Sequence, residues 1–138
     1  MDFKVRDWMN TLVVFIEPHN TVAEALALMR RRYIRSLIVN KSDQNPEYGI
    51  FTSTDVCDQI IAKEQNPGTV LVGDIMTTPL KTVKRDISLK ECSIIMKEHS
   101  IHHLPVVDDQ EEIIGMISAS DFLVAAESIG RAPGERII

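Results

Sequence analysis

Apolar residues recur along this chain first with the spacing of a helix face and then in short continuous runs. Val22, Ala25 and Met29 lie three or four positions apart, as they would on one face of a helix. Thr21, with Glu24 three residues later, forms a capping-box pattern that marks where this helix begins. Comparable runs predict four helices, over residues 21–32, 53–64, 88–98 and 119–129.

Between the helical runs lie short stretches of aliphatic and β-branched residues that are bounded by polar turns, which is typical of strands. Strands or extended segments are expected over residues 11–16, 36–40 and 48–52, and again over 80–83, 103–107 and 113–117. The order strand, helix, strand, strand, helix is therefore predicted twice.

This order recurs because the chain contains an internal repeat. Met9 and Met76 end similar segments and set an offset of 67 residues (76 minus 9). The offset falls to 66 (115 minus 49) at Gly49 and Gly115, which is consistent with one shorter loop. Units of about sixty residues are small, so we expect them to bury their apolar faces against each other. We predict two repeats and an irregular tail, over residues 2–66, 67–130 and 131–138.

One stretch matches closely in the two repeats, from Gly49 to Asp55 and from Gly115 to Asp121. Each copy is an apolar strand end, then hydroxyl residues, then a carboxylate at the opening of a helical run. The hydroxyl residues are Thr52 and Thr54 in the first copy and Ser118 and Ser120 in the second.

This motif suits a ligand that carries phosphate and sugar. The unpaired amides of a helix's first turn favour an anion, and Thr52 or Ser118 can donate to a phosphate oxygen. An ionised aspartate only accepts hydrogen bonds, and its two oxygens match the two adjacent hydroxyls of a ribose. The alternative is that Thr52 and Ser118 are ordinary N-caps and that the aspartates only favour the helix dipole.

Composition narrows the class of protein. The chain has 138 residues, 44% of them hydrophobic, which is enough for a globular core. A net charge of -5 gives no electrostatic reason to bind nucleic acid, and no apolar run is long enough to span a bilayer. The mixed charge of the first residues predicts no signal peptide, so we expect a cytoplasmic protein. Cys57 and Cys92 lie among apolar residues and are expected to be small core residues.

The repeated pattern resembles a tandem pair of cystathionine-β-synthase (CBS) domains, also called a Bateman module, over residues 2 to 130. The resemblance rests on Met9 and Met76, the capped helices, the strand Leu104-Pro105-Val106-Val107 and the repeated glycine-to-aspartate stretch. It implies an α+β fold of two pseudo-symmetric βαββα repeats packed sheet to sheet, with two clefts between them. Such modules commonly bind adenosine-containing ligands, sense cellular state and dimerise.

The first repeat departs from the family pattern in its second strand. Ile38 stands where the second repeat has Pro105, and Asn40 stands where it has Val107. We expect this departure to loosen or reshape that strand. The Asp121 site should therefore be the better of the two.

The resemblance also implies ligand roles. Thr52 and Ser118 would lie on the phosphate side, and Asp55 and Asp121 would hold ribose. The base would lie against the partner repeat, near Val13, Val14 and Ile34 for the Asp121 cleft, and near Leu80, Lys81 and Ile101 for the Asp55 cleft. Thr78 is also expected among the ligand-binding residues. The alternative for the apolar members is ordinary core.

Three further residues are candidates for a phosphate contact. Arg35, His102 and His103 lie at the start of the second strands. The planar fork of Arg35 suits a phosphate, and a histidine binds one more strongly below neutral pH. Solvated surface is the alternative for all three.

Catalysis is not expected. The chain lacks Cys-x-x-Cys, His-Glu-x-x-His, P-loop and Gly-x-Ser-x-Gly patterns. His102 and His103 point to opposite sides of a strand and cannot share a metal there. We predict a regulatory module with no required cofactor and no metal, which binds an adenine nucleotide such as AMP, ADP or ATP, or S-adenosylmethionine or NADH, and signals to a partner protein. The alternative is a ligand-free dimerisation or docking module.

The helices that follow the motifs carry more apolar residues than one core needs. The apolar side of the first helix is expected at Val56, Ile60 and Ile61, and that of the second at Phe122, Leu123 and Ala126. The apolar residues beyond what the core of one chain needs, which would pack against a partner, are expected to be Ile60, Ile61, Leu123, Val124 and Ala125. We predict a homodimer through the helices after Asp55 and Asp121. The alternative is that these side chains only flank the core of a single chain.

Overall fold

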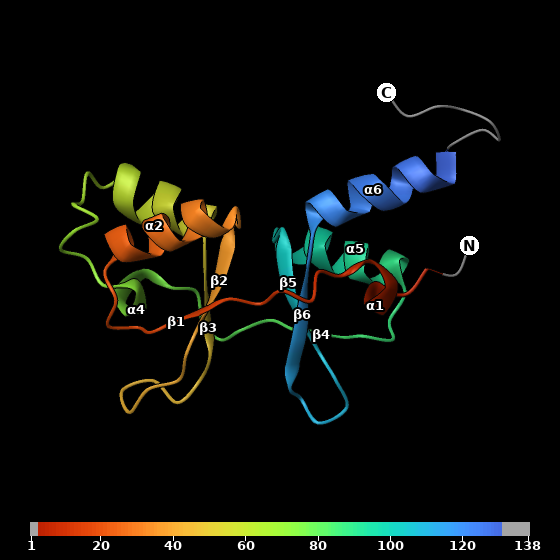
Figure 1. Cartoon of the computed structure of the whole chain (residues 1–138), viewed down its shortest axis with the longest axis horizontal. Helices are drawn as coiled ribbons and strands as arrows, with labels where there is room; N and C mark the ends of the chain where they lie inside the picture. The colour runs from red at the N-terminus through yellow and green to blue at the C-terminus, as the bar shows by residue number, and fades with distance from the viewer. Residues whose placement is uncertain (1–2, 131–138) are drawn as a thin grey trace. The chain divides into compact units, whose positions relative to one another are not determined.

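The computed structural model describes residues 3–130 (Figure 1). It has two three-stranded sheets, ordered β1-β2-β3 and β4-β5-β6, each with a parallel first pair and an antiparallel second pair. The strands are β1 (Phe15–Ile16), β2 (Ser36–Val39), β3 (Gly49–Thr52), β4 (Val83–Lys84), β5 (His103–Val107) and β6 (Ile113–Ser118). The predicted α+β class and the twice-repeated order of elements are confirmed. The predicted tail over 131–138 lies outside the described residues.

The two capped helices begin where the sequence predicts. In α2 (Val22–Arg32), the Thr21 hydroxyl accepts the Glu24 N–H at 3.1 Å, and the Glu24 carboxylate accepts the Thr21 N–H at 3.0 Å. In α5 (Leu89–His99), Ser88 accepts the Glu91 N–H at 3.0 Å. Because capping depends on residues three positions apart, it can be predicted from sequence alone.

Two single-turn helices, α1 (Val5–Trp8) and α4 (Val72–Ile75), were not predicted. Each is too short to show a helical period. The helix expected over residues 53–64 is instead α3 (Ser53–Asp55) followed by a π-helix, η1 (Val56–Ile61). The last helix, α6 (Ala119–Gly130), has the expected extent.

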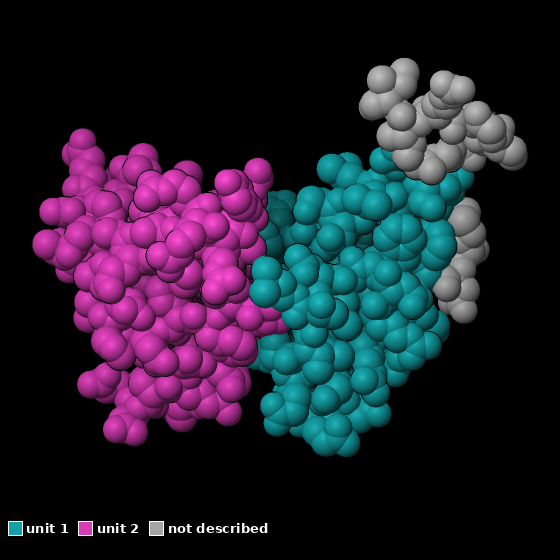
Figure 2. Space-filling model, viewed as in Figure 1, with its two compact units in different colours: residues 1–12, 82–138 teal, residues 13–81 magenta. Residues whose placement is uncertain are grey.

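The described chain forms two compact units, residues 13–81 and residues 3–12 with 82–130 (Figure 2). Residues 3–12 open the first repeat in sequence, yet they cluster with the compact unit of the second. In one unit the backbone of Asn10 pairs with Met116, and in the other Thr77 pairs with Ile50. The segment that leads into each repeat thus packs beside the glycine-to-aspartate motif of the other.

Close packing at two glycines explains why methionine and glycine recur together. A Cβ atom on Gly49 would lie 2.6 Å from Met76 Sδ, and one on Gly115 would lie 2.7 Å from Met9 Sδ. Both distances are shorter than any ordinary contact. The methionine of each leading segment therefore needs the glycine that opens the motif.

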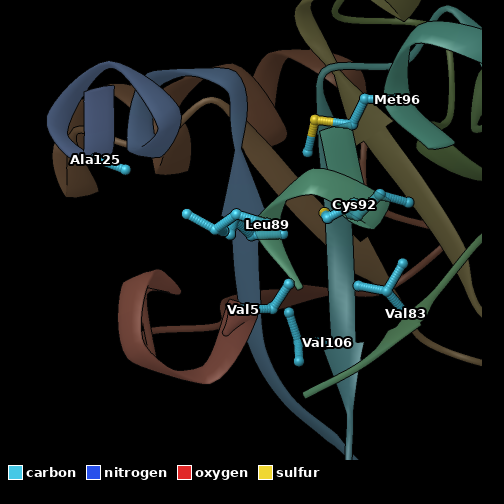
Figure 3. Packing of buried hydrophobic residues seen from close by; sticks show 9 residues of the cluster. Val5, Val83, Leu89, Cys92, Met96, Val106 and Ala125 are labelled. Carbon is cyan, nitrogen blue, oxygen red and sulfur yellow. The ribbon is translucent and has the colours of Figure 1, made fainter. Parts of the chain in front are cut away.

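Each unit has its own apolar core. One contains Val22, Phe51 and Ile60, with Phe51 fully buried. The other is built from α1, α5, α6 and the second sheet (Figure 3). Its labelled members are Val5, Val83, Leu89, Cys92, Met96, Val106 and Ala125.

The structure corrects several expected helix faces. Ile60 and Ala125 are buried in the core of their own unit, so neither is left over for a partner. Ile61 and Leu123, expected to face the core, are 68% and 72% exposed. Sequence neighbours on a helix point in different directions, so the core takes only one of each adjacent pair.

Two more residues of these helices depart from the prediction. Ala126 is exposed, since α6 packs on the core through Phe122 and Ala125, which are three positions apart. Cys57 is exposed, whereas Cys92 is buried as expected and burial raises its pKa to about 11.

The expectation of a loosened β2 strand is also wrong. Ile38 supplies the amide that Pro105 lacks, and it donates to the Val14 carbonyl at 3.0 Å. The strand pairs with β3 in continuous register. The irregularity lies instead in β5, between Val106 and Val107.

Candidate functional site

Asp55 ends the first turn after β3 and is buried, with 8% of its surface exposed. Its Oδ2 accepts the Thr52 N–H at 2.9 Å, which holds the turn from strand to helix. Its Oδ1 accepts the Thr77 hydroxyl at 2.8 Å. Both oxygens of this carboxylate are therefore engaged within residues 13–81.

Burial raises the pKa of Asp55 above the ordinary carboxyl value. The hydrogen bonds from Thr52 and Thr77 favour the ionised form and offset part of this rise, while the nearby charge of Asp58 adds to it. An ionised Asp55 thus depends on the donors that surround it.

Asp121 ends the equivalent turn and is only partly buried. Its Oδ2 accepts the Ser118 N–H at 2.8 Å and the Ser118 hydroxyl at 3.3 Å. The Ser118 and Ser120 hydroxyls lie 2.8 Å apart. Within residues 3–130, no donor hydrogen-bonds Asp121 Oδ1, so this oxygen is available to accept one.

Sequence reasoning placed Thr78 in the site and missed Thr77. The repeat offset of 67 (77 minus 10) aligns Thr77 with Asn10, and their backbones pair alike. The Thr77 N–H and carbonyl bond Ile50 at 2.9 and 3.0 Å, and those of Asn10 bond Met116 at 2.8 to 2.9 Å. The Asn10 side chain, however, accepts the Leu12 N–H at 2.9 Å, whereas that of Thr77 reaches the aspartate.

The predicted phosphate-side residues fall in both units. His103 opens β5 and lies opposite Ser118 in the strand register. The His102 carbonyl accepts the Ala119 N–H at 3.0 Å, which ties β5 to the first turn of α6. Arg35 is exposed directly before β2, in the unit of Asp55, and Thr54 is exposed in the first turn after β3.

A hollow of about 530 Å³ lies beside the first turn of α6. Ile101, His102, Ala119 and Phe122 contribute to its wall, together with residues of α5. Two predicted site residues, Ile101 and His102, thus line the same hollow in the unit of Asp121.

The base-side residues are only partly grouped. Thr78, Leu80 and Lys81 share a unit with Asp55, and Thr78 and Lys81 are exposed. Val14 and Ile34 pack against the core of residues 13–81, as Ile101 does against the other core, so ordinary packing accounts for part of their surface. The assignment of Val13, Val14 and Ile34 to Asp121, and of Ile101 to Asp55, stays a prediction.

Residues 3–130 contain neither a candidate metal site nor a membrane-spanning helix. No cluster of three or more histidine, cysteine, aspartate or glutamate side chains there has the arrangement to hold a metal ion. None of the helices in that range is both long enough and apolar enough to cross a membrane.

Comparison with known proteins is consistent with this repeat. The CBS domain family model matches residues 5–62 and 72–128. The chain is 30% identical over 131 residues to the CBS domain-containing protein YhcV of Bacillus subtilis and covers 91% of that protein. It is 32% identical over 111 residues to the protein MK0525 of Methanopyrus kandleri, of which it spans only 56%.

Solved structures share the fold. A hexameric CBS-CP12 protein from bloom-forming cyanobacteria superposes with a TM-score of 0.84 at 28% identity, covering all of this chain and 79% of that one. The CBS domain pair of protein MJ0100, in complex with 5′-methylthioadenosine and S-adenosyl-L-methionine, superposes with a TM-score of 0.78 at 20% identity. That superposition covers 94% of this chain and 99% of the other.

Proposed function

Because this chain belongs to the CBS domain family, we propose that it is a regulatory module that binds an adenosine-containing ligand and signals the ligand's level to a partner protein. The observation that carries the proposal is the Asp121 carboxylate. Its Oδ2 is fixed by Ser118, while no donor within residues 3–130 contacts its Oδ1. A carboxylate held in this way accepts hydrogen bonds without first having to be ordered.

A ribose supplies the matching donors. Its 2′- and 3′-hydroxyls are adjacent, and a charged acceptor strengthens the hydrogen bonds they donate. The linked hydroxyls of Ser118 and Ser120, with the first-turn amides of α6 that follow Ala119, would receive a phosphate or another polar group. His102 and His103 lie beside this turn and would add charge to a phosphate contact when protonated. In the other unit, Thr52, Thr54 and Arg35 would serve the same part of a ligand at Asp55.

The adenosine assignment draws further support from the family and from the MJ0100 pair, which binds two adenosine compounds. At 20% identity that protein shares the fold with this chain, so the choice among AMP, ADP, ATP, S-adenosylmethionine and NADH is for experiment. No catalytic role and no required cofactor are part of the proposal.

Thermal unfolding with each of these five compounds tests the proposal. A compound that binds only the folded chain stabilises it by about 2.7 kcal/mol at one hundred times its Kd, which raises Tm. Asp121→Ala should weaken binding by about 1–3 kcal/mol, since a charged hydrogen-bond acceptor is lost. Calorimetry that gives unchanged affinity for both Asp121→Ala and Asp55→Ala would overturn the role of the motifs.

We also propose that the module forms a homodimer through the helices after the motifs. Leu123 and Val124 on α6 are 72% and 57% exposed, and Ile61 on η1 is exposed as well. Large apolar residues exposed side by side favour burial against a second copy. The CBS-CP12 protein, which shares the fold, is hexameric.

Light scattering at tens of micromolar tests this assembly. We expect a dimer mass for the wild type and a monomer mass for Val124→Asp, because a charge is buried without a partner only in the dimer. Ile94→Asp is the matched control and should remain dimeric, because Ile94 is an exposed apolar residue of α5, outside the helices that follow the motifs. A monomeric wild type with and without nucleotide would exclude the dimer. A dimer that forms while none of the five compounds binds would favour the ligand-free docking module.

A further inference from the structure

We infer that Thr77 makes the two ligand motifs unequal: its hydroxyl occupies the Asp55 carboxylate, so that ribose binds at Asp121 and reaches Asp55 only by displacing Thr77. The inference rests on the proposed function and adds to it a residue that sets which motif is used. Thr77 lies outside both motifs, 22 positions from Asp55.

Thr77 is held in place by its backbone. Its N–H and carbonyl pair with Ile50 at 2.9 and 3.0 Å, in the strand that leads into the motif. Its side chain therefore starts from a fixed position beside Asp55. The hydroxyl donates to Oδ1 at 2.8 Å, a short and well-formed bond.

The Thr77 hydroxyl is chemically the donor that a ribose would bring. Both are aliphatic alcohols, and both would donate to the same carboxylate oxygen. A ribose that binds Asp55 through Oδ1 would replace one such bond by another, and this exchange yields little net free energy. Asp55 is also buried, with only 8% of its surface exposed, so neighbouring side chains would have to move before a sugar could reach it.

The Asp121 motif lacks this occupant. Asn10 takes the position of Thr77 and pairs with Met116 by the same two backbone bonds. Its side-chain oxygen accepts the Leu12 N–H at 2.9 Å, within its own turn. A ribose at Asp121 would thus add hydrogen bonds to Oδ1 rather than exchange them.

The two positions allow a reciprocal test by calorimetry, with AMP and S-adenosylmethionine titrated separately. The wild type should bind one equivalent. Asp121→Asn should weaken this binding by at least about 10-fold, whereas Asp55→Asn should change it less than about 2-fold. These three proteins already decide which aspartate is used, even where a Thr77 variant does not fold.

Thr77→Val keeps the shape of the side chain and removes the donor. It should add a second equivalent of binding, which Thr77→Val/Asp55→Asn should lose again. Asn10→Thr places a threonine hydroxyl at the equivalent point and should weaken binding at Asp121.

Two equal sites in the wild type would overturn the inference and leave the proposed function standing. Weaker binding in Thr77→Val would do the same, since Thr77 would then be a ligand contact. An unchanged single equivalent in Thr77→Val would overturn it too. Absence of binding in every protein would overturn the proposed function itself, and this inference with it.

Discussion

The carboxylates of Asp55 and Asp121 end the same turn, each six residues after a glycine (55 minus 49 and 121 minus 115), yet they are held differently. Both use Oδ2 to accept the N–H at the start of the turn, at 2.9 and 2.8 Å. At Oδ1, Asp55 accepts a hydroxyl from a distant residue, whereas Asp121 has no donor within the described range. Asp55 is buried and Asp121 is partly exposed.

This difference shows that a motif does not fix its own chemistry. Oδ2 serves the turn in both repeats, so the local geometry follows from the seven matching residues. The state of Oδ1 depends on whether the segment packed beside the motif carries threonine or asparagine. One side chain outside the motif therefore separates an engaged carboxylate from an available one.

The two aspartates can be compared as separate sites only if each unit has a core of its own. The largest predicted effect comes from a substitution that disrupts one of these two cores. Phe51 is fully buried and lies one strand position before Thr52. Phe51→Ala should lower the free energy of unfolding by about 3–5 kcal/mol, the usual cost of a cavity of that size. Urea unfolding measures it.

The amide NMR signals of the two motifs show which unit the substitution perturbs. In Phe51→Ala the Thr52 amide should shift, and the Ser118 amide should stay near its wild-type position. Equal shifts at both amides would contradict the division into two cores.

The elements that sequence predicted well are those set by near neighbours. The start of α2 follows from Thr21 and Glu24, and the short apolar runs between polar turns predicted the strands of both sheets. The change from strand to helix between Thr52 and Asp55 was predicted too, but the hydrogen bond from the Thr52 N–H to the Asp55 carboxylate was not.

What sequence reasoning missed depends on contacts between distant residues. The Thr77 bond to Asp55 spans 22 positions, and no pattern of residue types announces it. The close approach of Met76 to Gly49 is equally remote in sequence. The exposure of Cys57 and Ile61 depends on how η1 lies on its core, which apolar periodicity alone does not define.

A smaller predicted effect compares the two aspartates directly in the absence of ligand. Asp55→Ala should cost about 1–3 kcal/mol of stability, because the Thr52 N–H and the Thr77 hydroxyl both lose the acceptor that the buried carboxylate supplies. Asp121→Ala should cost about 1 kcal/mol, the typical loss for a helix cap, since the Ser118 hydroxyl keeps its contact with Ser120.

Urea unfolding of both variants under one set of conditions gives the ranking. Asp55→Asn is the matched control for shape, since it keeps a carbonyl oxygen for one of the two donors. A larger loss in Asp121→Ala than in Asp55→Ala would contradict the view that Asp55 is the more structural carboxylate.

The smallest predicted effect is a pH dependence that Asp55 contributes. Burial raises the pKa of Asp55 in the folded chain, so the native state holds this proton more tightly than the unfolded state does. The contribution of Asp55 to stability is therefore fully present below the ordinary aspartate pKa of about 3.9 and is lost as pH rises through the folded pKa. The free energy of unfolding of the wild type minus that of Asp55→Asn should accordingly fall with rising pH and then level off.

In this difference, the contributions of the other carboxyl groups to the pH dependence of stability cancel, because both proteins contain them. Glu24, whose pKa is lowered by the Thr21 backbone hydrogen bond, contributes with the opposite sign but does so in both proteins. Urea unfolding between about pH 3.5 and 7 measures the difference, and the ¹³C shift of the Asp55 carboxyl gives the folded pKa directly. A difference that rises with pH would mean that the donors Thr52 and Thr77 outweigh burial. In that case Asp55 would be stabilised as an anion, and a ribose would have still less to gain by displacing Thr77.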